Sequence, residues 1–121
     1  MAIANPLVLS YNAGTKSLVR INQDSYGSEY YLREATQDFR VKIRHLREAA
    51  GKNGVVIERH NVELTQTIFA TVAGTPDEVI QVYAVIRNAK TSTAVNTAKL
   101  GNALSAFLDD THYQDLVNWV N

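Results

Sequence analysis

The chain has 121 residues, 45% of them hydrophobic, which suits a single domain over residues 1–121 and leaves little room for a second. Twelve basic and twelve acidic residues cancel, so the net charge gives no argument for a nucleic-acid partner or an anionic membrane. Residues 1–60 nevertheless hold nine Lys or Arg against six Asp or Glu, whereas residues 61–121 hold three against six. This asymmetry is compatible with a basic ligand-facing layer and with contacts between subunits.

The lack of cysteine excludes a disulfide framework, a thiolate zinc site and a cysteine nucleophile. The first ten residues, MAIANPLVLS, lack the basic start and the long apolar run of a secretory signal. No stretch approaches the roughly 20 apolar residues that span a bilayer. The sequence therefore predicts a chain that is neither exported nor inserted in a membrane.

Alternating and β-branched stretches predict four strands in the first 46 residues. Strands near 6–11 and 17–22 flank a turn at 12–15, where Asn12 and Gly14 tolerate positive φ. A third strand is expected at 29–35 and a fourth at 38–46. In the fourth strand the apolar side chains Phe39, Val41 and Ile43 alternate with the basic side chains Arg40, Lys42 and Arg44.

The next stretch, from Val55 to Thr71, stays extended after a turn at 52–54. At about 3.3 Å per residue it is too long for one straight strand, so we expect a break near Glu58. Its apolar side chains Val62, Leu64 and Ile68 alternate with the polar side chains Asn61, Glu63, Thr65 and Thr67. The apolar face needs a core, whereas the polar face meets either water or a ligand.

After Gly74 the hydrophobic period predicts helices. For residues 75–90, Thr75 and Glu78 suggest a capping box and Pro76 suits the first helical position. Apolar residues then follow the helical i, i+3, i+4, i+7 spacing at Val79, Val82, Tyr83 and Ile86. A second helix is expected at 94–108, and the tail 111–121 can add a short one. Strands first and helices last indicate an α+β fold, an antiparallel sheet with helices on one face.

This order of an N-terminal β-hairpin, further strands and two C-terminal α-helices resembles the coat proteins of single-stranded RNA bacteriophages (levivirus-like). The stretches INQDSYGSEYYL, RHNVE and YAVIR are especially similar to coat proteins of the Caulobacter RNA phage type. Each motif is short, but their shared order and spacing extend from about residue 19 to the end. One departure is that few residues separate FRVKIRHL from RHNVE, which leaves the strand count between residues 38 and 71 open.

The resemblance implies an interlocked dimer in which the sheets join side by side and the helices of each subunit clasp the partner. Dimers would close an icosahedral shell with the helices outside, and the inner sheet would bind viral RNA. Val41, Ile43, Val62, Leu64 and Ile68 would pack under the helices. The resemblance assigns the RNA-facing side to Arg40, Lys42, Arg44, Arg59, Asn61, Glu63 and Thr65.

Asn61 and Glu63 match an Asn–Glu pair on the last strand of the family's RNA face. Two positions before that Asn the family has an aromatic residue, whereas this chain has Arg59. We therefore expect general binding of the RNA backbone rather than recognition of one hairpin. Basic residues at alternate strand positions are about 6.6 Å apart, close to the phosphate repeat of a nucleic-acid strand, and Asn and Glu can bond to base edges. The alternative is an ordinary solvated strand face.

The last fifteen residues carry more large apolar surface than a short helix can bury within its own subunit. We expect the dimer contacts to be Phe107, Leu108, Tyr113, Leu116 and Trp119.

No cofactor is expected. His112 follows Asp109 and Asp110, which could together hold a divalent cation between subunits, although a solvated helix end is the commoner interpretation.

No nucleophile elbow, phosphate-binding glycine loop or metalloprotease signature indicates an enzyme. His45 and His60 have the parity of the core face, which favours buried structural histidines over a catalytic pair. The sequence thus predicts a capsid protein of the virion that assembles in the bacterial host cytoplasm, with itself and viral RNA as partners. The alternative is a free-standing dimeric RNA-binding or ligand-binding α+β protein that forms no shell.

Overall fold

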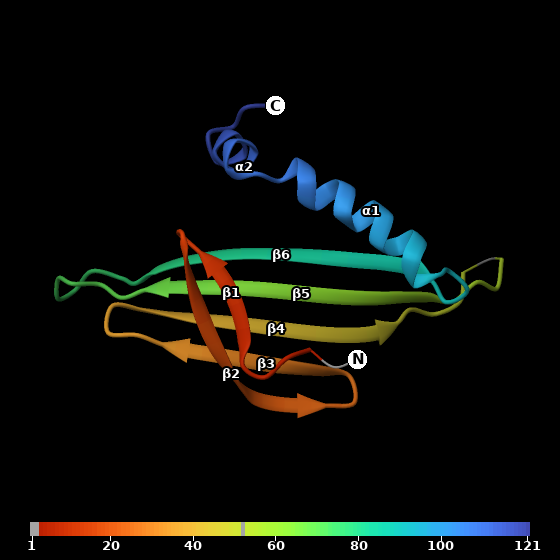
Figure 1. Cartoon of the computed structure of the whole chain (residues 1–121), viewed down its shortest axis with the longest axis horizontal. Coiled ribbons are helices and arrows are strands. Elements are labelled where there is room, and N and C mark those ends of the chain that lie inside the picture. Colours follow the sequence, from red (N-terminus) through yellow and green to blue (C-terminus); the bar gives the residue numbers. More distant parts are fainter. Residues whose placement is uncertain (1–2, 52) are drawn as a thin grey trace.

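The computed structural model describes residues 3–51 and 53–121 and shows a long antiparallel sheet followed by two helices (Figure 1). The strands pair in chain order, each with the next. Their bounds are β1 Leu7–Tyr11, β2 Gly14–Asp24, β3 Gly27–Arg33, β4 Gln37–Arg47, β5 Ile57–Ile68 and β6 Glu78–Ala89. The helices are α1 Ala94–Phe107 and α2 Asp110–Val117. The fold is therefore α+β, as the sequence predicts.

The β1–β2 hairpin turns on two residues, Asn12 and Ala13, both with positive φ. This is the two-residue turn whose twist suits antiparallel strands. Sequence reasoning expected Gly14 to take part in the turn, but it is the first residue of β2. The predicted turn at 52–54 is present at Gly54, which has a φ of 73°, whereas Lys52 lies outside the described residues.

The main sheet, β3 to β6, is covered on one face by the N-terminal hairpin. A register shift between Arg20 and Asn22 lets the first part of β2 turn away from β3, so β1 and β2 cross the longer strands (Figure 1). The buried core lies beneath this hairpin and consists of Leu18, Tyr30, Phe39, Val41 and Ile43, with Leu7, Leu9, Leu32 and Leu64 packed against it. Val41 and Ile43 are therefore covered by the hairpin, and not by helices as we had expected.

The predicted helix at 75–90 is wrong, because Glu78–Ala89 is strand β6. It pairs with β5 along its whole length, from Ile68 opposite Glu78 to Ile57 opposite Ala89. The spacing Val79, Val82, Tyr83, Ile86 is compatible with a helix, but the segment is rich in β-branched residues and has a long partner strand. Thr75 and Pro76 lie in the β5–β6 connection, where Asp77 accepts a hydrogen bond from the Ala70 amide at 2.8 Å.

The strand count between residues 38 and 71 is two. The connection from β4 to β5 is a loop, and β5 is one strand from Ile57 to Ile68. The predicted break near Glu58 is therefore wrong, because Glu58 lies inside β5 and pairs with Arg47. The predicted helix at 94–108 and the short terminal helix are both present. Neither described helix is long and apolar enough to cross a membrane.

The helices extend beyond the β6 edge and away from the sheet (Figure 1). Among the described residues of α1 and α2, none is buried. A helix in a globular protein gains most of its stability by packing an apolar side. Among the described residues of a single chain, α1 and α2 have no apolar surface to pack against.

Candidate nucleic-acid interface

One face of the sheet, here called the polar face, carries the larger share of the hydrophilic side chains of β4 to β6. Directly opposed residues on antiparallel strands share a face, so the register defines rows across the sheet. The rows are Tyr31–Arg40–Thr65–Gln81, Glu29–Lys42–Glu63–Tyr83, Arg44–Asn61–Val85 and Leu46–Arg59–Arg87. All seven residues that the sequence assigns to an RNA-facing side therefore lie on this one face.

The charge of the polar face is positive. On β3 to β6 it carries six basic side chains against three acidic ones. The basic residues are Arg33, Arg40, Lys42, Arg44, Arg59 and Arg87; the acidic residues are Glu29, Asp38 and Glu63. This surplus is a property of the face alone, because the whole chain is neutral.

Arg40 is less available than we had expected. Its guanidinium forms an ion pair with Glu29 and lies 4.8 Å from the ring centroid of Tyr31. Tyr31 in turn donates a hydrogen bond to Asp38 at 2.8 Å, and this bond raises the pKa of the Tyr31 hydroxyl. Arg40 therefore has a carboxylate partner within the fold, so its charge is already partly compensated.

Lys42 and Arg44 are the available charges of the row. Among the described residues, neither side chain has an ion-pair or hydrogen-bond partner. Lys42 lies between Glu29 and Glu63 in the register, and Arg44 is exposed opposite Asn61. Lys42 is half-buried and Arg44 exposed, and solvent-accessible cations without a partner are the groups that can exchange counterions for phosphate.

The polar residues of β5 are held by their neighbours. Arg59 donates from Nε to Asn61 Oδ1 at 3.2 Å, and among the residues that the structure describes no acceptor bonds the Asn61 amide nitrogen, which can donate elsewhere. Gln81 donates from Nε2 to Glu63 Oε1 at 2.5 Å and reaches Thr65 Oγ1 at 3.4 Å. These bonds fix the orientation of groups that can contact base edges.

Strand β6 adds functional candidates that the sequence analysis missed, because it placed this segment in a helix. Tyr83 lies opposite Glu63 and is 66% exposed, so its ring is presented on the polar face. Arg87 pairs with Glu48 at 2.6 Å, which lowers the pKa of Glu48 and raises that of Arg87. The available signal was the density of β-branched residues in this segment, namely Val79, Ile80, Val82, Val85 and Ile86.

Asn61 and Glu63 lie on the penultimate strand. The correspondence with an Asn–Glu pair on the family's last strand therefore does not hold, since β6 follows β5. What remains is their shared face with Lys42 and Arg44, which the register establishes independently.

The opposite side of the sheet, here called the apolar face, is only partly covered. Towards the β6 edge its exposed side chains are Val62, Ile80, Val82 and Ile86. Our expectation that Val62 is buried does not hold within one chain.

His45 and His60 belong to this face too, but His45 is exposed and His60 half-buried, so the expected burial of both is wrong. They are bonded to a neighbour, namely to each other, with their Nδ1 atoms 2.9 Å apart.

The proposed dimer residues project from the helices. Phe107, Tyr113, Leu116 and Trp119 are exposed, and Leu108 is half-buried. The Phe107 ring stacks on His112, whose centroid is 4.3 Å away. His112 Nδ1 lies 2.8 Å from Asp109, and Asp109 also caps α2 by accepting from the His112 amide, which lowers the pKa of Asp109. Among the described residues, no group of three possible ligands could hold a metal ion.

The match to a known family covers the whole sheet. A sequence model described as "Phage phiCb5, coat protein" matches residues 4–89, from just before β1 to the last residue of β6. Both helices lie beyond the matched part. Curated protein sequences gave no match. Because the match covers well over half of the chain, this protein belongs to the phage phiCb5 coat protein family, the coat proteins of a Caulobacter RNA phage type.

Proposed function

We propose that this phage capsid protein forms interlocked dimers, that the dimers close an icosahedral shell, and that the polar face binds single-stranded genomic RNA inside it. The observation that carries the proposal is the contrast between the two faces of one sheet. The polar face has a surplus of basic groups, whereas the apolar face and both helices expose apolar side chains.

RNA binding is supported by the kinds of group on the polar face. Lys42 and Arg44 supply unpaired charge for phosphates, which provides sequence-independent affinity. Tyr83 offers an exposed ring on which a base can stack, and Asn61 has a free amide donor for a base edge. The combination suits single-stranded RNA, since bases in a duplex are not accessible for stacking.

Dimer formation is supported by the uncovered apolar surface. The exposed residues Ile80, Val82 and Ile86 lie on the edge strand β6, beside which the described part of the chain places no further strand. A second β6 can pair with such an edge and remove its exposed amides from competing interactions. The helices of each chain, which extend past this edge, then have the partner's apolar face to cover.

The second candidate function is a free-standing RNA-binding dimer that forms no shell. It shares the polar face and the uncovered apolar face with the first. The family membership favours a shell, because a coat protein is a structural component of the virion. Assembly in the host cytoplasm is part of the proposal.

The test is expression of the full chain in bacteria, followed by size-exclusion chromatography and electron microscopy. Hollow or filled icosahedral particles support the shell, and dimers at all concentrations contradict it. Nuclease-protected RNA inside the particles supports RNA binding. Particles that form in the absence of RNA and take up none from solution would contradict the RNA part while leaving the shell intact.

A further inference from the structure

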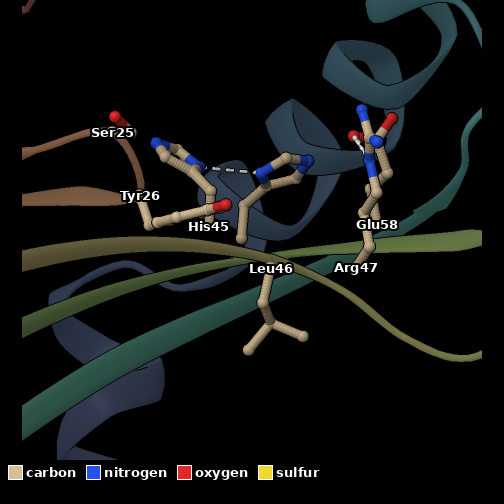
Figure 2. Close-up of a pocket in the computed structure, with 7 residues that line it drawn as sticks. Ser25, Tyr26, His45, Leu46, Arg47 and Glu58 are labelled. Atoms are coloured by element: carbon tan, nitrogen blue, oxygen red, sulfur yellow. Dashed lines mark hydrogen bonds and ion pairs between the residues drawn. The ribbon is translucent and has the colours of Figure 1, made fainter.

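On the apolar face, two histidines form a cross-strand pair beside an open pocket of about 470 Å³ (Figure 2). His45 of β4 lies directly opposite His60 of β5. Their Nδ1 atoms are 2.9 Å apart, and the rings meet edge to face with centroids 5.1 Å apart. The Leu46 side chain points to the other side of the strand from His45 (Figure 2), and His60 shares the face of His45 because the two residues are directly opposed.

We propose that His45 and His60 form a two-nitrogen binding site for a divalent transition metal of tetragonal preference, such as Cu²⁺ or Ni²⁺. The pair now shares one hydrogen, because one Nδ1 must donate and the other accept. A metal ion replaces that hydrogen when both rings carry their proton on Nε2. Neither RNA binding nor shell formation is needed for this site.

The present separation of the nitrogens matches one ligand geometry. With metal–nitrogen bonds of about 2.0–2.1 Å, two nitrogens 2.9 Å apart subtend an angle of about 90° at the metal. That is the angle between adjacent ligands in square-planar and octahedral complexes, whereas a tetrahedral Zn²⁺ site needs a wider one. Imidazole is a suitable ligand for all of these ions, and the observed separation is nearest to that of a square-planar or octahedral pair.

The surroundings favour a cation and leave room for its remaining ligands. Glu58 lies two residues before His60 on the same face of β5 and lines the same pocket. It faces Arg47, but their closest charged atoms are 3.7 Å apart, so its carboxylate is only loosely compensated. Ser25 and Tyr26, from the β2–β3 turn, also line the pocket. The open side of the pocket admits water as further ligands.

The strands hold the two imidazoles together before any metal binds. β4 and β5 pair continuously from Gln37 opposite Ile68 to Arg47 opposite Glu58, so the histidine pair is flanked by paired residues on both sides. In addition, the His45 amide donates to the Tyr26 carbonyl at 2.7 Å. A pre-organised pair binds more tightly than one histidine, because the second ligand acts at a high effective concentration.

The chain provides its own control, because its third histidine, His112, is bonded to Asp109 in α2. Purified full-length protein, stripped of metal with a chelator, would be titrated with Cu²⁺ by calorimetry. Electron paramagnetic resonance would count the nitrogens bound to the copper. The variants are His45→Gln, His60→Gln and His112→Gln, each checked for folding by circular dichroism.

The parent and His112→Gln should bind one Cu²⁺ per chain through two imidazole nitrogens. His45→Gln and His60→Gln should each lose on the order of 10²-fold in affinity and show one imidazole nitrogen or none. Thermal unfolding should shift upward with Cu²⁺ in the parent and His112→Gln, because the metal binds the folded pair. Equal Cu²⁺ affinity in all four proteins would overturn the proposal, and so would a signal from one nitrogen in the parent.

Discussion

Arg40 of β4 is ion-paired with Glu29 of β3, although both lie on the face proposed to bind RNA. A charge already compensated by a carboxylate has less to gain from a phosphate than an uncompensated one. We therefore expect Lys42 and Arg44, in the next two rows of the polar face, to contribute most of the electrostatic affinity for RNA.

The first prediction is that the double variant Lys42→Ala, Arg44→Ala weakens RNA binding. It should also lower the slope of log affinity against log salt concentration by about 1.4, because each phosphate contact with a single strand contributes about 0.7 to that slope. Arg40→Ala should lower the slope by less than either single change. Arg47→Ala is the matched control, because Arg47 is an exposed arginine on the same strand but on the other face. Filter binding over a salt series measures the slopes. If Arg47→Ala lowers the slope as much as the double variant does, the polar face is not the RNA surface.

A second prediction concerns the terminal helix. Leu116 is exposed in α2 and is proposed to pack on the partner, so Leu116→Asp should bury a charge in the interface and shift the protein towards monomer. Thr111→Asp is the control in the same helix, because Thr111 is exposed in the first turn, where a negative charge is tolerated. Sedimentation velocity at several concentrations reports the dimer. A dimer that is unchanged in Leu116→Asp, or in a chain that ends at Asp109, contradicts the clasp.

A third prediction concerns the close approach of β3 and β4 at Gly27. A Cβ built there would lie 2.2 Å from the Ile43 carbonyl oxygen, so Gly27→Ala forces the backbone of one strand to move. We expect a loss of about 1–3 kcal/mol in the free energy of unfolding. At Gly14, another strand glycine, the nearest atom to the added carbon is the Tyr11 carbonyl oxygen at 3.5 Å, an ordinary contact. Urea unfolding at one protein concentration should therefore show a larger loss of stability for Gly27→Ala than for Gly14→Ala. Equal losses of stability would mean that β3 and β4 do not approach closely at Gly27.

A fourth prediction concerns acid stability. Lys16 donates to both Glu34 oxygens, at 2.9 and 3.0 Å, and this bond is the main reason that the pKa of Glu34 is lowered. A lowered carboxyl pKa in the folded state means that the unfolded chain binds more protons as the pH falls. The stabilisation is therefore present above the ordinary Glu range and disappears as the pH falls through the folded-state value. Glu34→Gln should reduce the loss of stability between about pH 5 and pH 3, and Lys16→Met should have the same effect. An unchanged pH profile in both would mean that the pair makes no contribution.

The strands up to Ile68 could be predicted from sequence because turn residues bound β1 and β2, β3 is rich in aromatic residues, and apolar and polar residues alternate in β4 and β5. The faces of β4 and β5 were predictable for the same reason, and the register confirms that Arg40, Lys42 and Arg44 share a side with Asn61 and Glu63. What sequence reasoning could not supply was the non-local context. β6 contains residues that satisfy both a helical and an extended period, and only its pairing with β5 decides between them.

The same limit explains the errors at the core and in the candidate site. The position of the N-terminal hairpin over Phe39 and Val41 depends on a bulge near Ile21, which local patterns do not reveal. The pairing of Arg40 with Glu29 depends on which residue of β3 lies beside it. Tyr83 was missed because a helical assignment put it on a buried side.

The last prediction concerns Tyr83, which the structure adds to the polar face. Its side chain is 66% exposed and lies between Gln81 and Val85 on the polar face of β6. In the register it belongs to the row that contains Lys42 and Glu63. Stacking of a base on such a ring is worth about 1–3 kcal/mol, so Tyr83→Ala should weaken binding of single-stranded RNA by roughly 5- to 150-fold. The salt slope should stay unchanged, because a neutral side chain releases no counterions. Tyr26→Ala is the matched control, since Tyr26 is 71% exposed in the β2–β3 turn, away from the polar face. Filter binding at two salt concentrations, with particle RNA content as a second measurement, distinguishes the outcomes. If Tyr83→Ala binds RNA like the parent, or if Tyr26→Ala loses as much affinity, stacking on β6 is not part of RNA recognition and the basic residues of β4 must supply the affinity alone.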